Sequence, residues 1–315
     1  MLKIQNSDLF LRLEKTGAKK IGLQFPEGLK REAYAFADEL KIRGYDVIIS
    51  GDPCWGACDL DTSLISECDC LIHYGHAPVD DTKNVLYEFI SQDIEISSLE
   101  AVLPLLKTKK TGLVTTIQHV HELEKAKEFL KSNGIEAVIA KGSKRTPYPG
   151  QILGCSYEAA RNTECEEILF IGTGVFHPLG VSLATGARVV AFDPFMKIAE
   201  AVDSDKLLRQ RFVKIEKARN AGKFGIILSK KSGQKRVELA KRLCSLSDKA
   251  YLISLFEITP DALLNLGFDA YVNTACPRLA YDDQARYPRP VLSPAEFEIV
   301  LGLRNWEDFE IDEIV

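Results

Sequence analysis

The feature that most constrains the fold is a pattern of strands and helices that occurs three times along the 315 residues. Each occurrence holds three short apolar segments rich in β-branched residues, with amphipathic segments of helical period between them. The first strands of the units begin near residues 20, 111 and 224, which is too long a spacing for a solenoid and suits three small domains. The predicted strands are 19–25, 46–50, 69–74, 110–116, 136–140, 167–171, 189–193, 223–229, 250–255 and 269–273, and the predicted helices are 29–43, 60–67, 121–132, 157–162, 206–219, 234–246, 261–266 and 295–301.

Strands that alternate with helices along a chain form parallel sheets with helices on both faces. We therefore expect an α/β fold of three related small domains, each a parallel sheet flanked by helices, arranged around a shared central site. The expected domains are residues 1–100, 101–204 and 205–315, the last of which includes the C-terminal tail. The charged helix over residues 206–219 is expected to bridge the second and third domains.

The charge balance argues against nucleic acid as a direct partner, because 45 acidic residues outnumber 40 basic ones and the net charge is −5. The first residues lack the apolar core of a signal peptide. No apolar run approaches the roughly 18 residues of a membrane span. The resulting expectation is a cytoplasmic protein without membrane contact. Its eight cysteines are then core residues, reactive thiols or metal ligands rather than a disulfide framework.

One cysteine in each unit lies where its sheet is expected to end. Cys58 and Cys155 follow the second strands of their units, and Cys276 follows the third strand of its unit. Parallel strands present their carboxyl ends at one edge of a sheet, where open α/β folds place their sites. Three such edges facing one another would bring three thiolates together. Three thiolates can hold three irons of a [4Fe–4S] cluster and leave the fourth iron open for substrate.

The competing interpretation is that these cysteines are small core residues, as most single cysteines in α/β proteins are. No Cys-x-x-Cys pair supports a metal site, and Cys54 lies four residues before Cys58, a spacing that does not by itself indicate zinc. Cys54 is therefore predicted to be a bystander or an accessory thiol.

Six segments, in order along nearly the whole chain, resemble one family: 24–28, 51–59, 73–76, 150–155, 273–278 and 290–294. The sequence is similar to the archaeal radical enzymes of diphthamide biosynthesis, the 2-(3-amino-3-carboxypropyl)histidine synthases. The resemblance implies three related α/β domains that each give one cysteine to a [4Fe–4S] cluster. Carried over by motif, the metal ligands are Cys58, Cys155 and Cys276. It also implies a homodimer.

The resemblance implies a transferase that catalyses the first step of diphthamide biosynthesis on translation elongation factor 2. In such noncanonical radical enzymes, an electron from a donor of unknown identity reaches S-adenosylmethionine through the cluster. The bond from sulfur to the methionine γ-carbon breaks and 5′-methylthioadenosine leaves. The 3-amino-3-carboxypropyl radical adds to C2 of a histidine imidazole. Because the cofactors carry this chemistry, no side chain beyond the cluster ligands is expected to be catalytic.

Residues beside the family motifs are candidates for binding the cofactor. Arg278 follows the third ligand and suits the methionine carboxylate; the alternative is a surface ion pair. Gln24 and Glu27 follow the first strand and are placed to touch the cofactor. Gly28 is read as part of the turn.

His76 and His177 each follow the third strand of a unit and are further candidates for cofactor binding. Asp59 either caps the helix after Cys58 or lies near the cluster. Arg209 and Arg211, on the bridging helix, are either salt-bridged at the surface or contact the protein substrate.

Two positions depart from the family pattern. Cys54 stands where the family often has another residue, and Ala77 and Pro78 follow His76 where relatives often carry Ser-Cys. Two other functions compete: a quinolinate-synthase-like dehydratase, in which the open iron is a Lewis acid, and a non-catalytic partner subunit. Segments 273–278 and 290–294 favour the synthase over the dehydratase, and the presence of all three ligands argues against a non-catalytic subunit.

Overall fold

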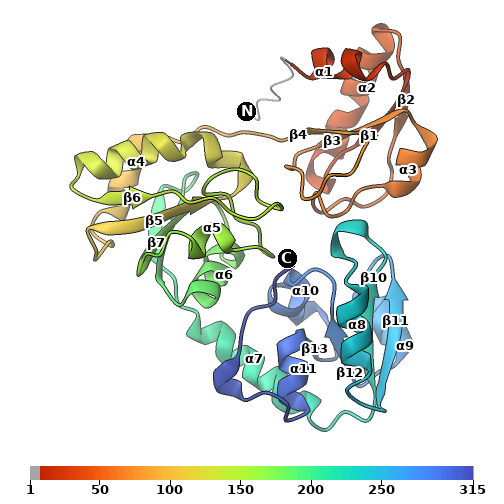
Figure 1. The fold of residues 1–315 in the computed structure, drawn as a ribbon, viewed down its shortest axis with the longest axis vertical. Helices are drawn as coiled ribbons and strands as arrows, with labels where there is room; N and C mark the ends of the chain where they lie inside the picture. Colours follow the sequence, from red (N-terminus) through yellow and green to blue (C-terminus); the bar gives the residue numbers. More distant parts are fainter. Residues whose placement is uncertain (1–7, 315) are drawn as a thin grey trace.

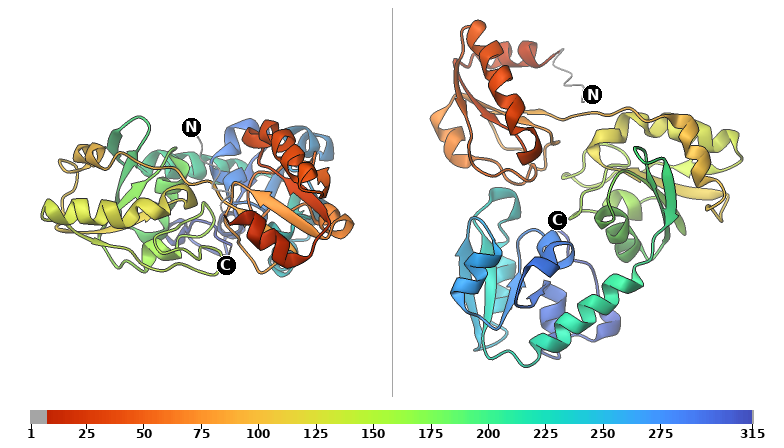
Figure 2. Two further views of the ribbon diagram at one scale, coloured as in Figure 1. Left: turned by 90° about the horizontal axis from the view of Figure 1, so that it is seen from above. Right: turned by 180° about the vertical axis from the view of Figure 1, so that it is seen from behind.

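The computed structural model describes residues 8–314 as three lobes around a common centre, each built on its own sheet (Figures 1 and 2). The first sheet has the strand order β2-β1-β3-β4, and every neighbouring pair is parallel. Its strands are β1 Lys20–Gln24, β2 Asp46–Ile49, β3 Cys70–Tyr74 and β4 Val85–Glu88, and its helices are α1 Leu9–Thr16, α2 Ala33–Ile42 and α3 Thr62–Glu67, with the 3-10 segment η1 Glu27–Glu32.

The second sheet has the order β6-β5-β7-β8-β9 and is parallel except at one edge, where β9 runs antiparallel to β8. A tight turn joins these two strands, since the Asp193 carboxylate accepts the backbone N–H of Phe195 and of Met196. A turn this short allows only antiparallel pairing, so the expectation of wholly parallel sheets is wrong at this edge. The elements are η2 Ile96–Val102, β5 Lys110–Thr115, η3 Ile117–Glu122, α4 Leu123–Ser132, β6 Glu136–Val138, α5 Glu158–Arg161, β7 Glu167–Ile171, α6 Phe176–Thr185, β8 Arg188–Asp193 and β9 Ile198–Ala201.

The third sheet has the order β11-β10-β12-β13 and is parallel throughout. The long helix α7 Asp205–Ala218 leads into it from the second lobe, as predicted (Figure 1). The other elements are β10 Phe224–Ser229, η4 Ser232–Gln234, α8 Val237–Cys244, β11 Ala250–Leu255, α9 Pro260–Leu266, β12 Ala270–Asn273, α10 Arg278–Tyr281, η5 Asp283–Arg286, β13 Val291–Leu292, α11 Pro294–Val300 and η6 Trp306–Asp308.

The three sheets share one topology, which confirms the predicted α/β class. In each, the first strand lies between the second and the third, and a further strand follows beyond the third. A 3-10 segment follows the first strand of every unit before the first long helix begins. The predicted helices 29–43, 121–132 and 234–246 therefore start later as α-helices than their apolar periodicity indicated. The exact boundaries after residues 100 and 204 remain a prediction.

The second and third lobes share apolar packing, whereas the first lobe has its own core. One buried cluster joins Tyr157 and Phe170 of the second lobe to Ile227 and Tyr271 of the third. Another, around Leu23, lies wholly within the first lobe. No helix among residues 8–314 is both long enough and apolar enough to cross a membrane.

Arg211 of α7 is fully buried, so both alternatives predicted for it, a surface salt bridge and a substrate contact, are wrong. Its Nε donates to the Glu296 carboxylate at 2.6 Å. Its other nitrogens donate to the Gln284 side chain at 3.0 Å and to the Val291 carbonyl at 2.8 Å. Burying a guanidinium is tolerable only when it is paired and hydrogen-bonded in this way. Arg209, in contrast, is exposed.

Candidate metal centre

Cys58 lies in the loop between β2 and α3, and the third lobe packs directly on it. The Gln234 side-chain amide donates to the Cys58 sulfur at 3.2 Å. The backbone N–H of Gly233 donates to the Cys58 carbonyl at 3.2 Å. A Cβ at position 233 would stand only 2.5 Å from the Cys58 Cα. The absence of a side chain at Gly233 is thus what lets these two lobes meet at the cysteine.

Cys155 lies in a tight turn of the second lobe, where Leu153 and Ser156 bridge. Its carbonyl accepts the backbone N–H of Ile314 at 2.8 Å, so the C-terminal segment contacts this turn. The Arg145 guanidinium lies beside the Cys155 thiol and also donates to the Gly233 carbonyl at 3.1 Å. Arg145 therefore joins the second lobe to the segment that packs on Cys58.

Cys276 follows β12, and its loop is braced by side chains from two directions. The Asn273 amide donates to the Cys276 carbonyl at 2.8 Å. Arg236 donates to the carbonyls of Thr274 at 2.8 Å and Ala275 at 3.1 Å. Arg236 also pairs with Asp312 of the C-terminal segment at 2.6 Å. The C-terminal segment thus contacts both the Cys155 turn and the side chain that holds the Cys276 loop.

The three thiols lie close enough to influence one another electrostatically. Burial, followed by the nearby Cys58 and Cys155, raises the pKa of Cys276. Burial raises the pKa of Cys155 to about 11, against the opposing effect of Arg145. Burial also raises the pKa of Cys58, although the Gln234 hydrogen bond opposes it. Three thiolates crowded together need a compensating positive charge, which bound metal supplies.

The spacing of the three sulfurs does not suit a single ion. Two sulfurs on one zinc are at most about 4.6 Å apart, because each Zn–S bond is about 2.3 Å. Within residues 8–314, the groups of three potential ligands whose donor atoms all lie within 4.8 Å of one another do not include these three cysteines. Converging thiols with a wider spacing suit a polynuclear cluster, in which each sulfur binds a different metal.

Asp59 joins the first lobe to the third rather than capping a helix. Its carboxylate pairs with the buried Lys231 ammonium at 2.7 Å. The cap of α3 is Asp61, whose carboxylate accepts the Leu64 N–H at 2.9 Å. The capping alternative for Asp59 is therefore wrong, while its sequence position places it next to Cys58.

Gln24 and Glu27 hold the loop that carries Cys58. Gln24 is buried, and its amide nitrogen donates to the Asp59 carbonyl at 2.8 Å. The Glu27 carboxylate accepts the Cys54 N–H at 3.2 Å and pairs with Lys30 at 2.6 Å. The Lys30 hydrogen bond lowers the pKa of Glu27, although the small burial of the carboxyl opposes it.

The two candidate histidines occupy different settings. His76 lies in the loop after β3, and its Nδ1 is 3.0 Å from Nε2 of His73. His177 lies in the first turn of α6, which was not predicted, and its ring stacks on Phe170 with centroids 6.0 Å apart. Burial lowers the pKa of each imidazole to about 4. Both are therefore neutral near pH 7.

Arg278 makes the surface ion pair that was considered as the alternative to a cofactor role. Its side chain is 56% exposed and pairs with Asp282 at 2.6 Å. Its guanidinium also lies over the Phe176 ring, 5.5 Å from the centroid. Arg278 lowers the pKa of His177 as a secondary effect after burial, which places the two side chains near one another.

Sequence reasoning missed three side chains that contact the cysteine loops: Arg145, Gln234 and Arg236. Gln234 and Arg236 reach the loops of Cys58 and Cys276 from positions distant in sequence, so spacing gives no sign of them. Arg145 precedes Cys155 within the same lobe. The basic run of Lys144 and Arg145 shortly before Cys155 was the one available signal.

The fold and the centre define a class of α/β protein in which three related sheets each direct one cysteine to a shared site. The chain matches the sequence model of the family described as "Putative diphthamide synthesis protein" over residues 25–311, and it belongs to that family. It is 41% identical to the 2-(3-amino-3-carboxypropyl)histidine synthase of Pyrococcus horikoshii over 325 residues, covering 99% of this chain and 94% of that protein.

More distant relatives and solved structures agree with this assignment. Subunit 1 of the synthase from Homo sapiens is 32% identical over 315 residues, covering 94% of this chain and 71% of that protein. The crystal structure of Dph2 from Pyrococcus horikoshii with a 4Fe-4S cluster superposes with a TM-score of 0.93 and 38% identity, covering 100% of this chain and 95% of that one.

Proposed function

We propose that this protein is a [4Fe–4S]-dependent transferase that moves a 3-amino-3-carboxypropyl group from S-adenosylmethionine to a histidine of translation elongation factor 2. The acceptor atom is C2 of the imidazole, and the second product is 5′-methylthioadenosine. The observation that carries the proposal is the convergence of one thiol from each of three related sheets. The similar synthase of Pyrococcus horikoshii and the cluster named with the Dph2 structure support it.

Cys58, Cys155 and Cys276 are the proposed cluster ligands, and the surrounding residues suit that role. Arg145 and Arg236 bring positive charge toward Cys155, which lowers the cost of burying thiolates. Gln234 donates to the Cys58 sulfur, a type of contact that tunes the potential of a cluster. When bound, a cluster of this kind supplies one electron to the sulfonium of S-adenosylmethionine.

Arg278 is proposed to bind the methionine carboxylate, with His177 beside it. The present ion pair of Arg278 with Asp282 is largely exposed, and such a pair contributes little free energy. Exchanging it for a substrate carboxylate therefore costs little. The neutral His177 imidazole can donate or accept one hydrogen bond there without adding charge.

Gln24, Glu27, Asp59 and His76 are proposed to support the cofactor site from the first lobe. Gln24 and Glu27 hydrogen-bond to the loop of residues 51–59 and fix it on the end of β1, and His76 contacts His73 at the end of β3. A rigid loop keeps the cluster and the reacting carbon in a fixed relative position and shields a radical from water.

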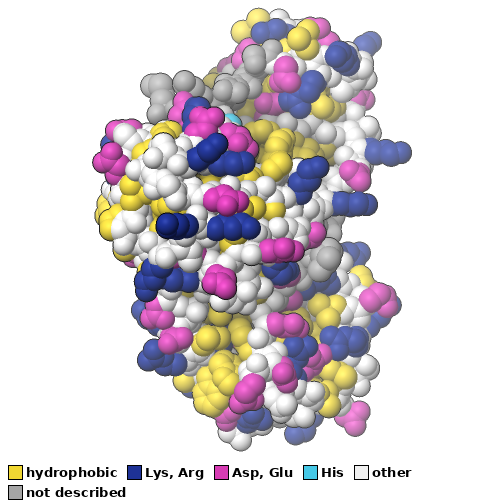
Figure 3. All heavy atoms as spheres, turned by 60° about the vertical axis from the view of Figure 1, so that its left-hand side comes forward, with side chains coloured by type: hydrophobic (Ala, Val, Ile, Leu, Met, Phe, Trp, Pro, Cys, Tyr) yellow, Lys and Arg dark blue, Asp and Glu magenta, His cyan; other side chains and the backbone are white. Residues whose placement is uncertain are grey.

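A homodimer, a cytoplasmic location and a separate electron donor complete the proposal. On the face drawn in Figure 3, Lys and Arg side chains are interspersed with Asp and Glu. This mixture suits a protein substrate better than a nucleic acid, which favours a continuous basic surface.

The experiment that tests the proposal is anaerobic reconstitution with iron and sulfide, followed by reduction in the presence of S-adenosylmethionine and elongation factor 2. 5′-Methylthioadenosine is expected, together with a mass gain of one aminocarboxypropyl group on the factor. Appearance of 5′-deoxyadenosine instead would contradict the proposed bond cleavage. Lack of any turnover by a fully loaded cluster would favour the non-catalytic subunit, and dehydratase activity would favour the quinolinate-synthase-like alternative.

A further inference from the structure

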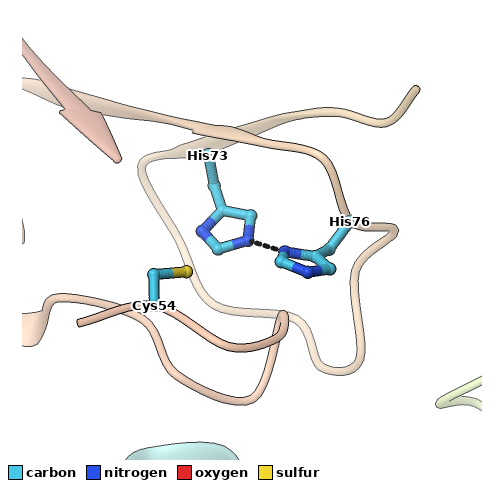
Figure 4. Close-up of side chains that lie close together, drawn as sticks. All are labelled: Cys54, His73 and His76. Atoms are coloured by element: carbon cyan, nitrogen blue, oxygen red, sulfur yellow. Dashed lines mark hydrogen bonds between the residues drawn. The ribbon is translucent and has the colours of Figure 1, made fainter. Parts of the chain in front are cut away.

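A second group of potential metal ligands lies in the first lobe, apart from the three cysteines. Cys54, His73 and His76 each offer one donor atom, and these atoms all lie within 4.8 Å of one another. Figure 4 shows the Cys54 sulfur directed toward the two imidazoles, which face each other. Cys54 and His73 are fully buried, and His76 is partly buried. We propose that Cys54, His73 and His76 bind one divalent transition-metal ion, with zinc as the expected ion.

The protein fixes which nitrogen of His73 faces the site. The Asp61 N–H donates to the Gln24 side-chain oxygen at 3.2 Å, and the Gln24 amide nitrogen donates to the Asp59 carbonyl at 2.8 Å. These two contacts set the orientation of the Gln24 amide. The same Gln24 oxygen lies 2.9 Å from His73 Nδ1, which must therefore carry the proton. Nε2 of His73 is left with its lone pair directed at the site.

This arrangement is the one that metal-binding histidines use. A ligating imidazole almost always donates its other N–H to an oxygen that fixes its tautomer and ring orientation. Gln24 supplies that oxygen to His73. Gln24 is itself hydrogen-bonded to backbone groups of Asp59 and Asp61, in the loop that carries Cys54. His73 and Cys54 are therefore held by one hydrogen-bonded unit.

The distances suit a single small ion. Two nitrogens bound to one tetrahedral zinc stand about 3.3 Å apart, because each Zn–N bond is about 2.0–2.1 Å. Nε2 of His73 and Nδ1 of His76 are 3.0 Å apart, within a few tenths of that spacing. Cysteine and imidazole are ligands typical of zinc, and three protein ligands leave the fourth tetrahedral position for water.

Binding requires two changes of protonation that leave the rest of the site in place. The Cys54 thiol loses its proton to solvent and becomes the thiolate ligand. Without an ion, Nδ1 of His76 donates its proton to Nε2 of His73; with an ion, that proton is carried by Nε2 of His76 instead. Each ion bound therefore releases one proton from the protein, and affinity increases with pH.

The ion would tie the loop of Cys54 to the end of β3. Cys54 lies four residues before Cys58 in the same loop, and its backbone N–H and carbonyl both contact Glu27. The proposed zinc therefore anchors the Cys54 end of the loop, whereas the contacts of Gln24 with Asp59 and of Gly233 with Cys58 hold the Cys58 end without it. It is not one of the cluster metals, and the proposal stands whether or not the three cysteines hold a cluster.

The test uses cobalt as a spectroscopic substitute for zinc in the full-length chain. Cys58, Cys155 and Cys276 are changed to Ala, which leaves the first-lobe group intact. After removal of metal with a chelator, anaerobic titration with Co²⁺ is expected to give one equivalent of tetrahedral cobalt with a thiolate charge-transfer band. Adding Cys54→Ser should abolish that band, and His76→Asn should weaken binding at least tenfold. Cys68→Ser, outside the group, should change neither.

Binding that survives Cys54→Ser and His76→Asn unchanged, or no stoichiometric binding, would overturn the proposal. A second measurement covers the case in which the triple variant does not fold. Zinc-edge X-ray absorption of the wild-type protein is expected to show one sulfur and two nitrogen ligands, and the Cys54→Ser protein should lack this zinc while keeping its iron and sulfide. Zinc coordinated by sulfur alone would contradict the site.

Discussion

The backbone N–H of Gly233 donates to the carbonyl of Cys58 across the boundary between the third and first lobes, at 3.2 Å. A methyl group at position 233 would stand 2.5 Å from the Cys58 Cα and 2.7 Å from its Cβ. Because neither backbone can yield cheaply, this contact fixes how closely the two lobes approach. The position of Cys58 relative to the other two thiols depends on it.

Gly233→Ala is expected to push the third lobe away from Cys58. Overpacking of this kind costs about 1–3 kcal/mol, and the displaced thiol should bind the cluster poorly. Iron and sulfide content after anaerobic reconstitution, and the midpoint of thermal unfolding, should both fall. Gly28→Ala is the matched control, since a Cβ at Gly28 has no atom within 4 Å. Equal cluster content in both variants would show that the contact does not position Cys58.

Arg211 is buried with Glu296, whereas Arg209 is exposed on the same helix α7. We therefore expect substitutions of these two arginines to differ greatly in their effect on the free energy of unfolding. Arg211→Met leaves the Glu296 carboxylate buried without its partner, which should cost about 3–5 kcal/mol in the free energy of unfolding. Arg209→Ala, at an exposed position, should change it by less than about 0.5 kcal/mol. Urea denaturation measures both.

A double variant separates the buried charge from lost packing. Glu296 also closes the capping box of α11 with Ser293, and glutamine can serve in that box. Glu296→Gln added to Arg211→Met should therefore recover part of the lost stability. No recovery would mean that the unpaired carboxylate is not the main cost.

Because His177 is buried as a neutral imidazole, we expect the folded protein to lose stability in mild acid. Its pKa is lowered by burial to about 4, against 6.5 for a free imidazole. As the pH falls from 6.5 towards 4, the unfolded chain takes up this proton before the folded one does, so folding stability decreases. The contribution of neutral His177 is fully present above pH 6.5.

The comparison with His177→Gln isolates this group, because His73 and His76 titrate identically in both proteins. The midpoint of thermal unfolding should fall less between pH 7 and pH 5 in the variant than in the wild type. Parallel pH profiles would indicate that His177 is not held neutral by its surroundings.

We expect the C-terminal segment to stabilise the centre formed by the three cysteines, because Asp312 of that segment holds Arg236. Its carboxylate pairs with Arg236, whose guanidinium holds the carbonyls before Cys276. Asp312→Ala leaves a mostly buried guanidinium without its ion pair, which should cost about 3 kcal/mol and reduce iron and sulfide content. Asp308→Ala, at an exposed position nearby, is the control. Full cluster content in Asp312→Ala would show that the C-terminal segment does not stabilise the centre.

Much of the fold was predictable because its strands carry strong local signals. The segments that became β7 and β10 are continuous apolar runs bounded by polar residues or turns, and such runs read as buried parallel strands. The two-residue strand β13 and the short strand β4 carry too little pattern to be recognised. They form because the preceding strands offer them a free edge, which is a property of the folded sheet.

The site was predictable only in part, for a similar reason. The internal repeat singled out Cys58, Cys155 and Cys276, since each follows a strand of its own unit. Gln234 reaches the Cys58 loop from the third lobe, and Arg145 links the Cys155 turn to Gly233 of the third lobe. No local pattern encodes either contact between lobes. The group of Cys54, His73 and His76 also depends on folding, because β3 and the loop after β2 bring its members together.

The most direct measurement of the central claim is the iron and sulfide content of single cysteine variants after anaerobic reconstitution, together with 5′-methylthioadenosine formation. Cys58→Ala, Cys155→Ala and Cys276→Ala are each expected to lose the cluster or the activity, whereas Cys54→Ala should largely keep both. Retention of an active cluster by any of the first three, or its loss from Cys54→Ala, would contradict the assignment of the three ligands.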